Sequence, residues 1–277
     1  MYTKFYNLRE NPFNVTSDPS FLFMSKRHRE ALAFLTYGIE QRKGFLEITG
    51  EIGTGKTTLC KALLNKLDKK VKTAFIINPE LSELQLLGSI AEDFGVELPK
   101  KANKLLIFHL LNKFLIHQLS LKNNVVLIID EAQNLKPIIL EQIRLLSNLE
   151  TEKEKLIQIV LVGQPELRDK LNSPGLAQLR QRITIRYHIV PLDENEIGDY
   201  IGHRLNVAGS DGRIKFPEEA ISEIFKFSEG VPRLINVVCD RALLFGFVLE
   251  TTHMTMDIVK RAMDEIKGQV VYEPSPS

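Results

Sequence analysis

A glycine-rich stretch between residues 48 and 59 constrains the fold more than any other feature. It reads ITGEIGTGKTTL, and residues 50–57 satisfy the pattern G-x-x-x-x-G-K-[ST]. A short apolar strand is predicted before it, at residues 44–48, and an amphipathic helix after it, at residues 57–67. Glycines let the backbone turn tightly, so that successive N–H groups point inward at phosphate oxygens. An ordinary glycine-rich turn is the alternative, but the flanking strand and helix favour a phosphate-binding loop.

The loop assigns definite roles to two side chains if it holds the phosphates of ATP. Lys56 reaches the β and γ phosphates, and the Thr57 hydroxyl ligates Mg²⁺. The following helix adds the positive end of its dipole. The other expected nucleotide contacts come from the same stretch: Gly50, Glu51, Ile52, Gly53, Thr54, Gly55 and Thr58.

An acidic pair, Asp130 and Glu131, directly follows another apolar run in the stretch VVLIIDEAQ. Asp130 is expected to hold Mg²⁺ through water, and Glu131 to orient or deprotonate the attacking water. The alternative is a solvated rim of two acids at a strand end. A Glu directly after the Asp favours ATP hydrolysis over nucleotide binding alone.

The hydrophobic pattern of the first two-thirds of the chain alternates between strands and helices. Continuous apolar runs at residues 72–79, 124–131 and 157–164 predict strands buried on both faces of a parallel sheet. Residues 182–190 alternate instead, as expected of an edge strand. Helices are predicted at 83–94, 104–119 and 138–149. This order predicts an α/β fold, a parallel sheet sandwiched by helices.

The pattern changes to helices alone after Pro191. Asp193 and Glu196 have the spacing of a capping box. Helices are predicted at 194–208, 217–227, 233–249 and 256–267, with no strand pattern between them. We therefore expect four parts: an N-terminal segment, 1–43, packing on the core; an α/β nucleotide-binding domain, 44–191; a helical lid domain, 192–268; and a flexible tail, 269–277.

Composition excludes several classes of protein. Lys and Arg number 36 against 35 Asp and Glu, so a nucleic-acid role would need a local basic patch. Only Cys60 and Cys239 are present, which indicates two reduced thiols. The N-terminus has no secretory signal pattern, and no apolar run approaches the roughly 20 residues of a membrane span. We therefore expect a cytoplasmic chain.

Three further polar residues lie where an ATPase would use them. Gln164 ends the fourth apolar strand and is expected to touch the γ phosphate or the water; a turn-starting Gln is the alternative. Asn78 ends the second strand and is expected to hydrogen-bond Glu131 in the idle site, or to start an Asn-Pro turn. Arg233, at a helix start, is expected to reach the nucleotide and couple the domain angle to its state; a solvated cation is the alternative.

Three arginines lie just before and within the last strand, at positions 180, 182 and 186. A guanidinium there is expected to serve a neighbouring subunit's phosphate as an arginine finger. That function requires a homo-oligomer with head-to-tail contacts. The alternative is a basic rim that pairs with nearby carboxylates.

Together these motifs resemble those of the AAA+ ATPases, specifically the general secretion pathway protein A (ExeA-like) group. The resemblance covers residues 5–267 and rests on GEIGTGKTTL, IIDEAQNL, LEQIRLLSNLET, LVGQPEL, LRQRI, GVPRLIN and the N-terminal segment. It implies Walker A and Walker B motifs at Lys56 with Thr57 and at Asp130 with Glu131. It further implies an arginine finger at Arg182, with Arg186 and Arg180 as alternatives. The two sensor positions fall on Gln164 and Arg233. The segment that contacts the adenine falls on Asn11, Pro12 and Phe13. A hydrophobic staple explains Phe13 equally well.

The resemblance implies a ring-like homo-oligomer that hydrolyses ATP to assemble or remodel a protein partner, such as a secretion or pilus complex. It also implies that the chain reaches the inner face of the inner membrane through partners. The alternative is a DNA-associated ATPase, a transposition or replication-initiation helper. Two lysine clusters favour it: Lys69, Lys70 and Lys72, and Lys100, Lys101 and Lys104. The neutral net charge and the lack of a helix-turn-helix pattern disfavour it.

A third hypothesis is a nucleotide-gated switch with little turnover.

Members of the group commonly continue into a membrane span and a periplasmic wall-binding domain. This chain stops at Ser277, so we expect either an ATPase part or a cytosolic relative.

Overall fold

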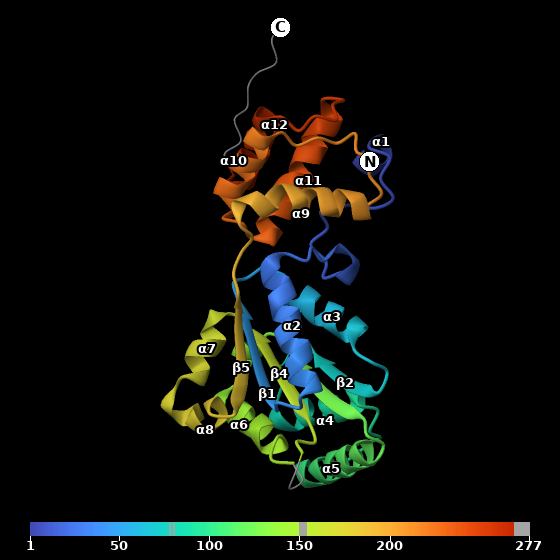
Figure 1. The fold of residues 1–277 in the computed structure, drawn as a ribbon, viewed down its shortest axis with the longest axis vertical. Coiled ribbons are helices and arrows are strands. Elements are labelled where there is room, and N and C mark those ends of the chain that lie inside the picture. Colours follow the sequence, from blue (N-terminus) through green and yellow to red (C-terminus); the bar gives the residue numbers. More distant parts are fainter. Residues whose placement is uncertain (78, 80, 150–153, 269–277) are drawn as a thin grey trace. The chain divides into compact units, whose positions relative to one another are not determined.

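Five parallel strands form one sheet within the residues that the computed structural model describes, which are 1–77, 79, 81–149 and 154–268 (Figure 1). The strands are β1 (Phe45–Gly50), β2 (Val71–Ile76), β3 (Asn124–Ile129), β4 (Gln158–Gly163) and β5 (Ile183–Ile189). Their order is β2-β3-β4-β1-β5, and every neighbouring pair is parallel. The three central strands are almost fully buried, because their apolar runs face helices on both sides. The predicted α/β fold with a parallel sheet and a helical C-terminal region is confirmed.

Helices cover both faces of the sheet, and successive side chains along a strand point to opposite faces. Val125, Leu127 and Ile129 of β3 join the core formed with one set of helices, while Val126 and Ile128 point to the other face. The first set is α4 (Glu83–Asp93), α5 (Lys104–Ser120), α6 (Pro137–Leu146), α7 (Pro165–Leu171) and α8 (Ala177–Arg180). The opposite face carries α2 (Lys26–Glu40) and α3 (Lys56–Lys66) (Figure 1). Both faces of the central strands are therefore dry.

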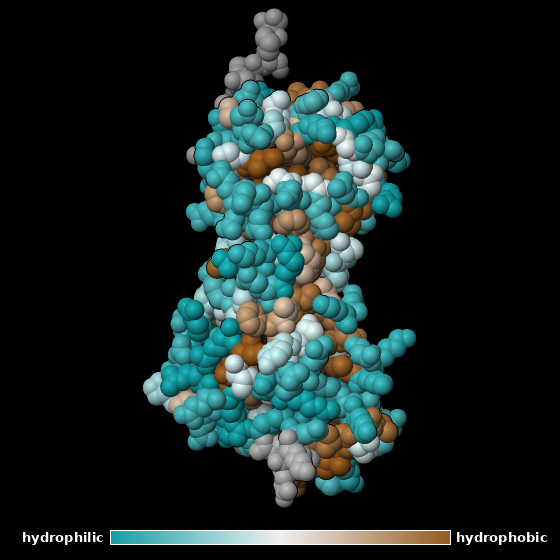
Figure 2. All heavy atoms as spheres, in the orientation of Figure 1, coloured by the Kyte–Doolittle hydropathy of each residue, from teal (hydrophilic) through white to brown (hydrophobic). Residues whose placement is uncertain are grey.

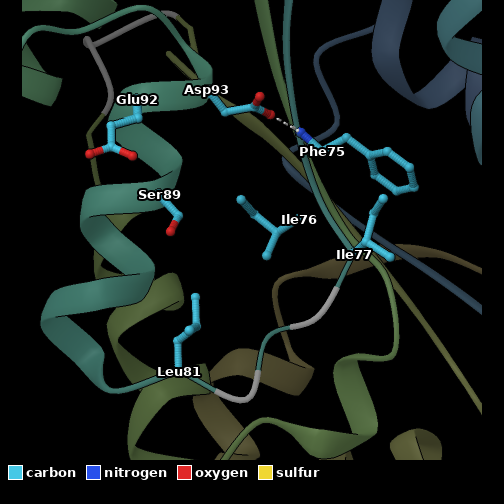
Figure 3. A pocket seen from close by; sticks show the side chains of 7 residues that line it. All are labelled: Phe75, Ile76, Ile77, Leu81, Ser89, Glu92 and Asp93. Carbon is cyan, nitrogen blue, oxygen red and sulfur yellow. Dashed lines mark hydrogen bonds between the residues drawn. The ribbon is translucent and has the colours of Figure 1, made fainter.

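The second predicted strand differs from the expectation of full burial. β2 lies at the edge of the sheet, and its residues alternate between buried and partly exposed positions. Its free edge is not bare, because the Asp93 carboxylate of α4 accepts a hydrogen bond from the Phe75 N–H (Figure 3). A continuous apolar run is compatible with an edge strand when a neighbouring helix covers part of it. β5, predicted as an edge strand, is one.

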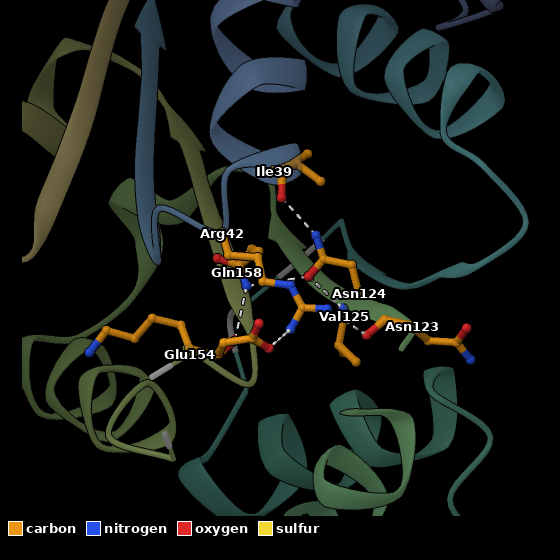
Figure 4. Close-up of polar contacts among 8 residues, drawn as sticks. Ile39, Arg42, Asn123, Asn124, Val125, Glu154 and Gln158 are labelled. Atoms are coloured by element: carbon orange, nitrogen blue, oxygen red, sulfur yellow. Dashed lines mark hydrogen bonds and ion pairs between the residues drawn. The ribbon is translucent and has the colours of Figure 1, made fainter. Parts of the chain in front are cut away.

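A polar network closes the amino-terminal edge of the sheet (Figure 4). The buried Gln158 amide accepts from the Gly44 N–H at 2.8 Å and donates to the Asn124 side chain at 3.3 Å. Asn124 in turn donates to the Ile39 carbonyl at 2.7 Å, and Arg42 pairs with Glu154 at 3.0 Å. These bonds tie β1, β3, β4 and the end of α2 together. This edge is thus occupied by structural contacts.

Backbone contacts divide the chain into two compact units. The sheet unit comprises Lys26–Glu51 and Lys56–Ile189, and the helical unit comprises Met1–Ser25, Ile52–Gly55 and the described residues from Val190 onward. The helical unit contains α9 (Glu194–Val207), α10 (Glu218–Ser228), α11 (Pro232–Val248) and α12 (Met256–Ile266). The Glu196 carboxylate accepts from the Asp193 N–H at 3.2 Å, as the capping box predicts.

The N-terminal segment, predicted as one piece packing on the nucleotide-binding core, is divided between the units. Its first 25 residues include α1 (Tyr2–Phe5) and the 3₁₀ turn η1 (Pro19–Phe21) and contribute Tyr6, Phe13 and Phe21 to the core of the helical unit. The rest forms α2 on the sheet. The predicted tail, 269–277, lies outside the described residues.

Two surface observations complete the fold. Hydrophobic residues gather over α5 (Figure 2), where Leu105 is 80% exposed and Ile116 is also exposed, while Ile107, Leu111 and Leu115 are buried against the sheet. Apolar side chains thus lie on both the buried and the exposed face of this helix. Among the described residues, no helix combines the length and apolar character needed to cross a bilayer.

Candidate nucleotide-binding and hydrolysis site

The phosphate-binding loop, residues 50–57, connects the carboxyl end of β1 to the first turn of α3. Gly53 and Gly55 have φ angles of 83° and 92°, which side-chain-bearing residues rarely adopt. At Gly53 a Cβ atom would also lie 2.6 Å from the Arg233 Cβ. Backbone conformation therefore favours glycine at both positions, and close approach also requires it at Gly53. The motif fixes Gly55, whereas Gly53 falls at one of its variable positions.

Lys56 folds back over this loop. Its side chain is only 6% exposed, and its ammonium donates to the Gly50 carbonyl at 2.8 Å and to the Glu51 carbonyl at 2.9 Å. Burial lowers the pKa of Lys56, and the nearby carboxylates of Glu131 and Asp130 oppose that shift. Within the described residues, the direct hydrogen-bond acceptors of this buried cation are two neutral carbonyls, which suits it to receive an anion.

Thr57, in the first turn of α3, meets Asp130, which directly follows β3. The Thr57 hydroxyl donates to the Asp130 carboxylate, which also accepts from the Glu131 N–H at 2.9 Å. Asp130 is almost completely buried. Burial raises its pKa, and the hydrogen bonds from Thr57 and Glu131 oppose the rise. A hydroxyl and a carboxylate oxygen in contact form the donor set that Mg²⁺ prefers, so these residues fit that ion.

Glu131 is held by two side-chain amides. Gln133 Nε2 donates to Glu131 Oε2 at 2.5 Å, and Gln164 Nε2 donates to the same oxygen at 3.2 Å. Gln164 follows β4, which lies between β3 and β1 in the sheet, so the amide and the carboxylate come from neighbouring strands. The structure therefore brings together the predicted residues Lys56, Thr57, Asp130, Glu131 and Gln164. Asn78 lies outside the described residues.

Gln133 was not singled out from the sequence. It lies in the 3₁₀ turn η2 (Ala132–Asn134), two residues after Glu131. A single polar residue after an acidic pair belongs to no periodic pattern that would indicate a function. The only signal was an amide side chain directly following the motif IIDEA.

Arg233, predicted as the first residue of a helix, is the second residue of α11 in the helical unit. Its side chain is exposed. Its backbone N–H donates to the Gly53 carbonyl at 3.3 Å. The tip of the loop and the start of α11 thus touch within the helical unit.

Pro12 and Phe13 are both buried in the helical unit. The Pro12 carbonyl accepts from Arg204 Nε at 2.6 Å, and the Asn14 carbonyl accepts from Arg204 Nη2 at 2.8 Å. Arg204 also lies over the Phe21 ring, 4.7 Å from its centroid. Arg204, which the sequence did not indicate, anchors this segment.

The three candidate finger arginines have different surroundings. Arg182 Nη1 donates to the Ser147 hydroxyl at 3.0 Å. Arg186 lies 3.2 Å from the buried Glu47 carboxylate. Arg180 is exposed, and its guanidinium makes no hydrogen bond or ion pair within the described parts of the chain. Arg180 and Arg182 are thus more available than Arg186.

Two further surface features, a pocket and the basic clusters, lie outside this site. A pocket beside β2 is lined by Phe75, Ile76, Ile77, Leu81, Ser89, Glu92 and Asp93 (Figure 3). Two carboxylates and no described cation line it, which disfavours phosphate binding there. Among the predicted basic clusters, Lys104 pairs with Glu83 instead of lying free for DNA.

Comparison with known proteins finds a matching family and a similar relative. Residues 39–171 match the family described as AAA domain. General secretion pathway protein A of Aeromonas hydrophila is 44% identical over 268 residues, which is 97% of this chain and 49% of that protein. The chain therefore spans about half the length of that relative.

Solved structures show the same fold. The ORC2 protein of Aeropyrum pernix, in ADPNP–ADP complexes, superposes with a TM-score of 0.72 at 17% identity, covering 95% of this chain and 73% of that one. Drosophila ORC bound to DNA superposes with a TM-score of 0.68 at 20% identity, covering 92% of this chain and 64% of that one. These matches support the fold assignment.

Proposed function

We propose that this chain, a AAA+ P-loop protein of the general secretion pathway protein A family, binds Mg–ATP and hydrolyses it to ADP and phosphate. One observation carries the proposal: Thr57 contacts Asp130 beside the buried Lys56, and Glu131 follows directly. A cation, an oxygen donor pair for a metal and a carboxylate base therefore gather at one end of the sheet.

The residues divide the work as follows. The N–H groups of residues 50–58 and the Lys56 ammonium bind the phosphate chain. Thr57 and Asp130 would hold Mg²⁺, which neutralises phosphate charge as it develops. Glu131 accepts the proton of a water whose oxygen attacks the γ phosphorus, while the bond to the bridging oxygen breaks.

Four further residues complete the proposed site. Gln164 contacts the γ phosphate or the attacking water, which its place beside Glu131 supports. Arg233 contacts the nucleotide, which its bond to Gly53 supports. Pro12 and Phe13 contact the adenine; for these two, the resemblance is the support.

We further propose that the chain acts as a homo-oligomer in which an arginine of the 180–186 segment reaches a neighbour's nucleotide. The work done with ATP is the assembly or remodelling of a partner complex, and the relationship to general secretion pathway protein A favours a secretion apparatus. A salt-sensitive, ATP-dependent shift of duplex DNA by this chain would instead favour the DNA-associated alternative.

Calorimetry and turnover test the ATPase proposal. Lys56→Ala is expected to abolish Mg–ATP binding, since it removes the only buried cation described in the loop. Lys66→Ala, at the exposed end of α3, is the matched control and is expected to bind normally. Glu131→Gln is expected to bind ATP normally and to lose roughly 10²- to 10⁴-fold in kcat.

Two outcomes would contradict these assignments. Unchanged affinity of Lys56→Ala for Mg–ATP would remove the binding site. Unchanged turnover of Glu131→Gln would remove the base and favour a nucleotide-gated switch.

A further inference from the structure

The Gln133 side chain is fixed at both ends of its amide. Nε2 donates to Glu131 Oε2 at 2.5 Å, while Oε1 accepts from the Gln164 N–H at 3.1 Å. The backbone is held as well, because Lys170 Nζ donates to the Gln133 carbonyl and, at 2.9 Å, to the Leu135 carbonyl. One amide thus bridges the end of β3 and the end of β4.

The end of β4 leaves room for this bridge. A Cβ atom at Gly163 would lie 2.7 Å from Gln133 Oε1, closer than side chains approach in proteins. The φ angle of Gly163 is not positive, so backbone conformation does not require glycine there. The space beside Gly163 is occupied by the Gln133 amide and by Leu167.

The bridge acts on a residue under backbone strain. Glu131 has a φ angle of 51°, in the left-handed region that costs a non-glycine residue about 1–3 kcal/mol. Its carboxylate receives both amide hydrogen bonds, from Gln133 and Gln164, on Oε2. Within the described residues, Oε1 accepts none. The two amides therefore fix the rotation of the carboxylate and leave one oxygen to take a proton.

We infer that Gln133 is a positioning residue for Glu131 in ATP hydrolysis. The inference rests on the proposed function of Glu131 as the base that activates water. Gln133 contributes no charge and holds the carboxylate in one orientation, so that Oε1 faces the attacking water. Its loss affects the rate of the chemical step. The affinity for ATP stays unchanged, because the binding residues Lys56 and Thr57 lie on α3 and not on the turn that carries Gln133.

The test compares Gln133→Met with the wild type. Methionine has nearly the same length and volume and no hydrogen-bonding amide. We expect kcat to fall about 10- to 100-fold, because misplacement of a catalytic group by about 1 Å costs up to that amount. The Kd for Mg–ATP, measured by calorimetry, and the circular dichroism spectrum are expected to match the wild type. Gln41→Met, at an exposed glutamine after α2, is the control and is expected to keep full turnover.

A second variant approaches the bridge from outside. Lys170→Met removes the ammonium that holds the Gln133 backbone, and we expect a smaller fall in kcat, which Lys170→Arg restores. A kcat of Gln133→Met within twofold of the wild type, or a Kd that weakens in proportion to kcat, would overturn the inference. If Gln133→Met does not fold, a Lys170→Met enzyme with unchanged kcat overturns it. A wild-type chain without turnover overturns the proposed function itself, and is thus a distinguishable result.

Discussion

Glu47 is a carboxylate buried in the middle of β1, one of the three central strands. Its side chain is 2% exposed, and Arg186 approaches it to 3.2 Å from β5. Burial raises the pKa of Glu47, while Arg186 and Arg168 oppose the rise. The folded protein therefore favours the protonated acid. Stability from this group is fully present below the ordinary pKa of Glu and is lost as pH rises through the higher folded-state value.

Glu47→Gln should therefore stabilise the protein at pH 8. Glutamine keeps the shape of the side chain and removes the cost of the buried charge, so we expect a gain on the order of 1 kcal/mol in the free energy of unfolding. The gain should shrink as pH falls toward 4, where the wild-type carboxyl is itself protonated. Chemical denaturation at several pH values measures this difference. Arg186→Met is the opposing control, since it removes the partner and should destabilise more at pH 8 than at pH 4. A loss of stability in Glu47→Gln at pH 8 would contradict the argument.

At the scale of elements, a single arginine of α9 holds the N-terminal segment. Arg204 is buried, donates to two carbonyls about 190 positions earlier and lies over an aromatic ring. Hydrogen bonds from a charged group contribute about 1.5–3 kcal/mol each, and the carbonyls left behind would be partly buried.

Arg204→Met is expected to lower the free energy of unfolding by about 3 kcal/mol. Hydrogen exchange should show faster exchange of the amides of residues 8–22, with α5 in the sheet unit unchanged. Arg213→Met is the matched control, because its exposed pair with Asp211 contributes little. Unchanged exchange in residues 8–22 would show that the apolar contacts of Phe13 and Phe21 alone hold the segment.

Elements were predictable from sequence where their pattern is local. The helices of the helical unit were predicted to within about two residues, because each has an amphipathic period and a start or stop signal. The edge position of β2 was not predictable, since an apolar run looks alike at the centre and at a helix-covered edge. The helix α2 was missed although Ala31, Leu32, Leu35 and Ile39 have helical spacing.

The site shows the same division. The phosphate-binding loop and the acidic pair are contiguous motifs, and in the structure Thr57 of the one contacts Asp130 of the other. Gln133 acts through the neighbouring strand β4, and Arg204 acts on carbonyls far away in the chain. Such partners depend on strand order and helix packing, which spacing along the chain does not encode.

At the scale of the whole molecule, an oligomer is the state in which the arginines before and within β5 would act. Arg186 is tied to the buried Glu47, and leaving that pair would strand a carboxylate. Among the described residues, Arg182 donates a hydrogen bond to the Ser147 hydroxyl alone, and Arg180 is exposed. The finger function is therefore expected from Arg182 or Arg180, and Arg186 is expected to serve stability.

Mixing two inactive variants tests whether the finger acts between subunits. Lys56→Ala has intact arginines and no ATP site, while Arg182→Ala or Arg180→Ala has an intact site and lacks one arginine. Each variant alone should hydrolyse ATP slowly, because every interface lacks one half of the site. In an equal mixture with random assembly, about a quarter of the interfaces combine an intact site with an intact arginine, so turnover should recover to about that fraction of the wild type. Dilution below the assembly concentration should abolish the recovery. A mixture that stays inactive for both arginines would place the finger within its own subunit, and full activity of both single variants would exclude both residues from the reaction.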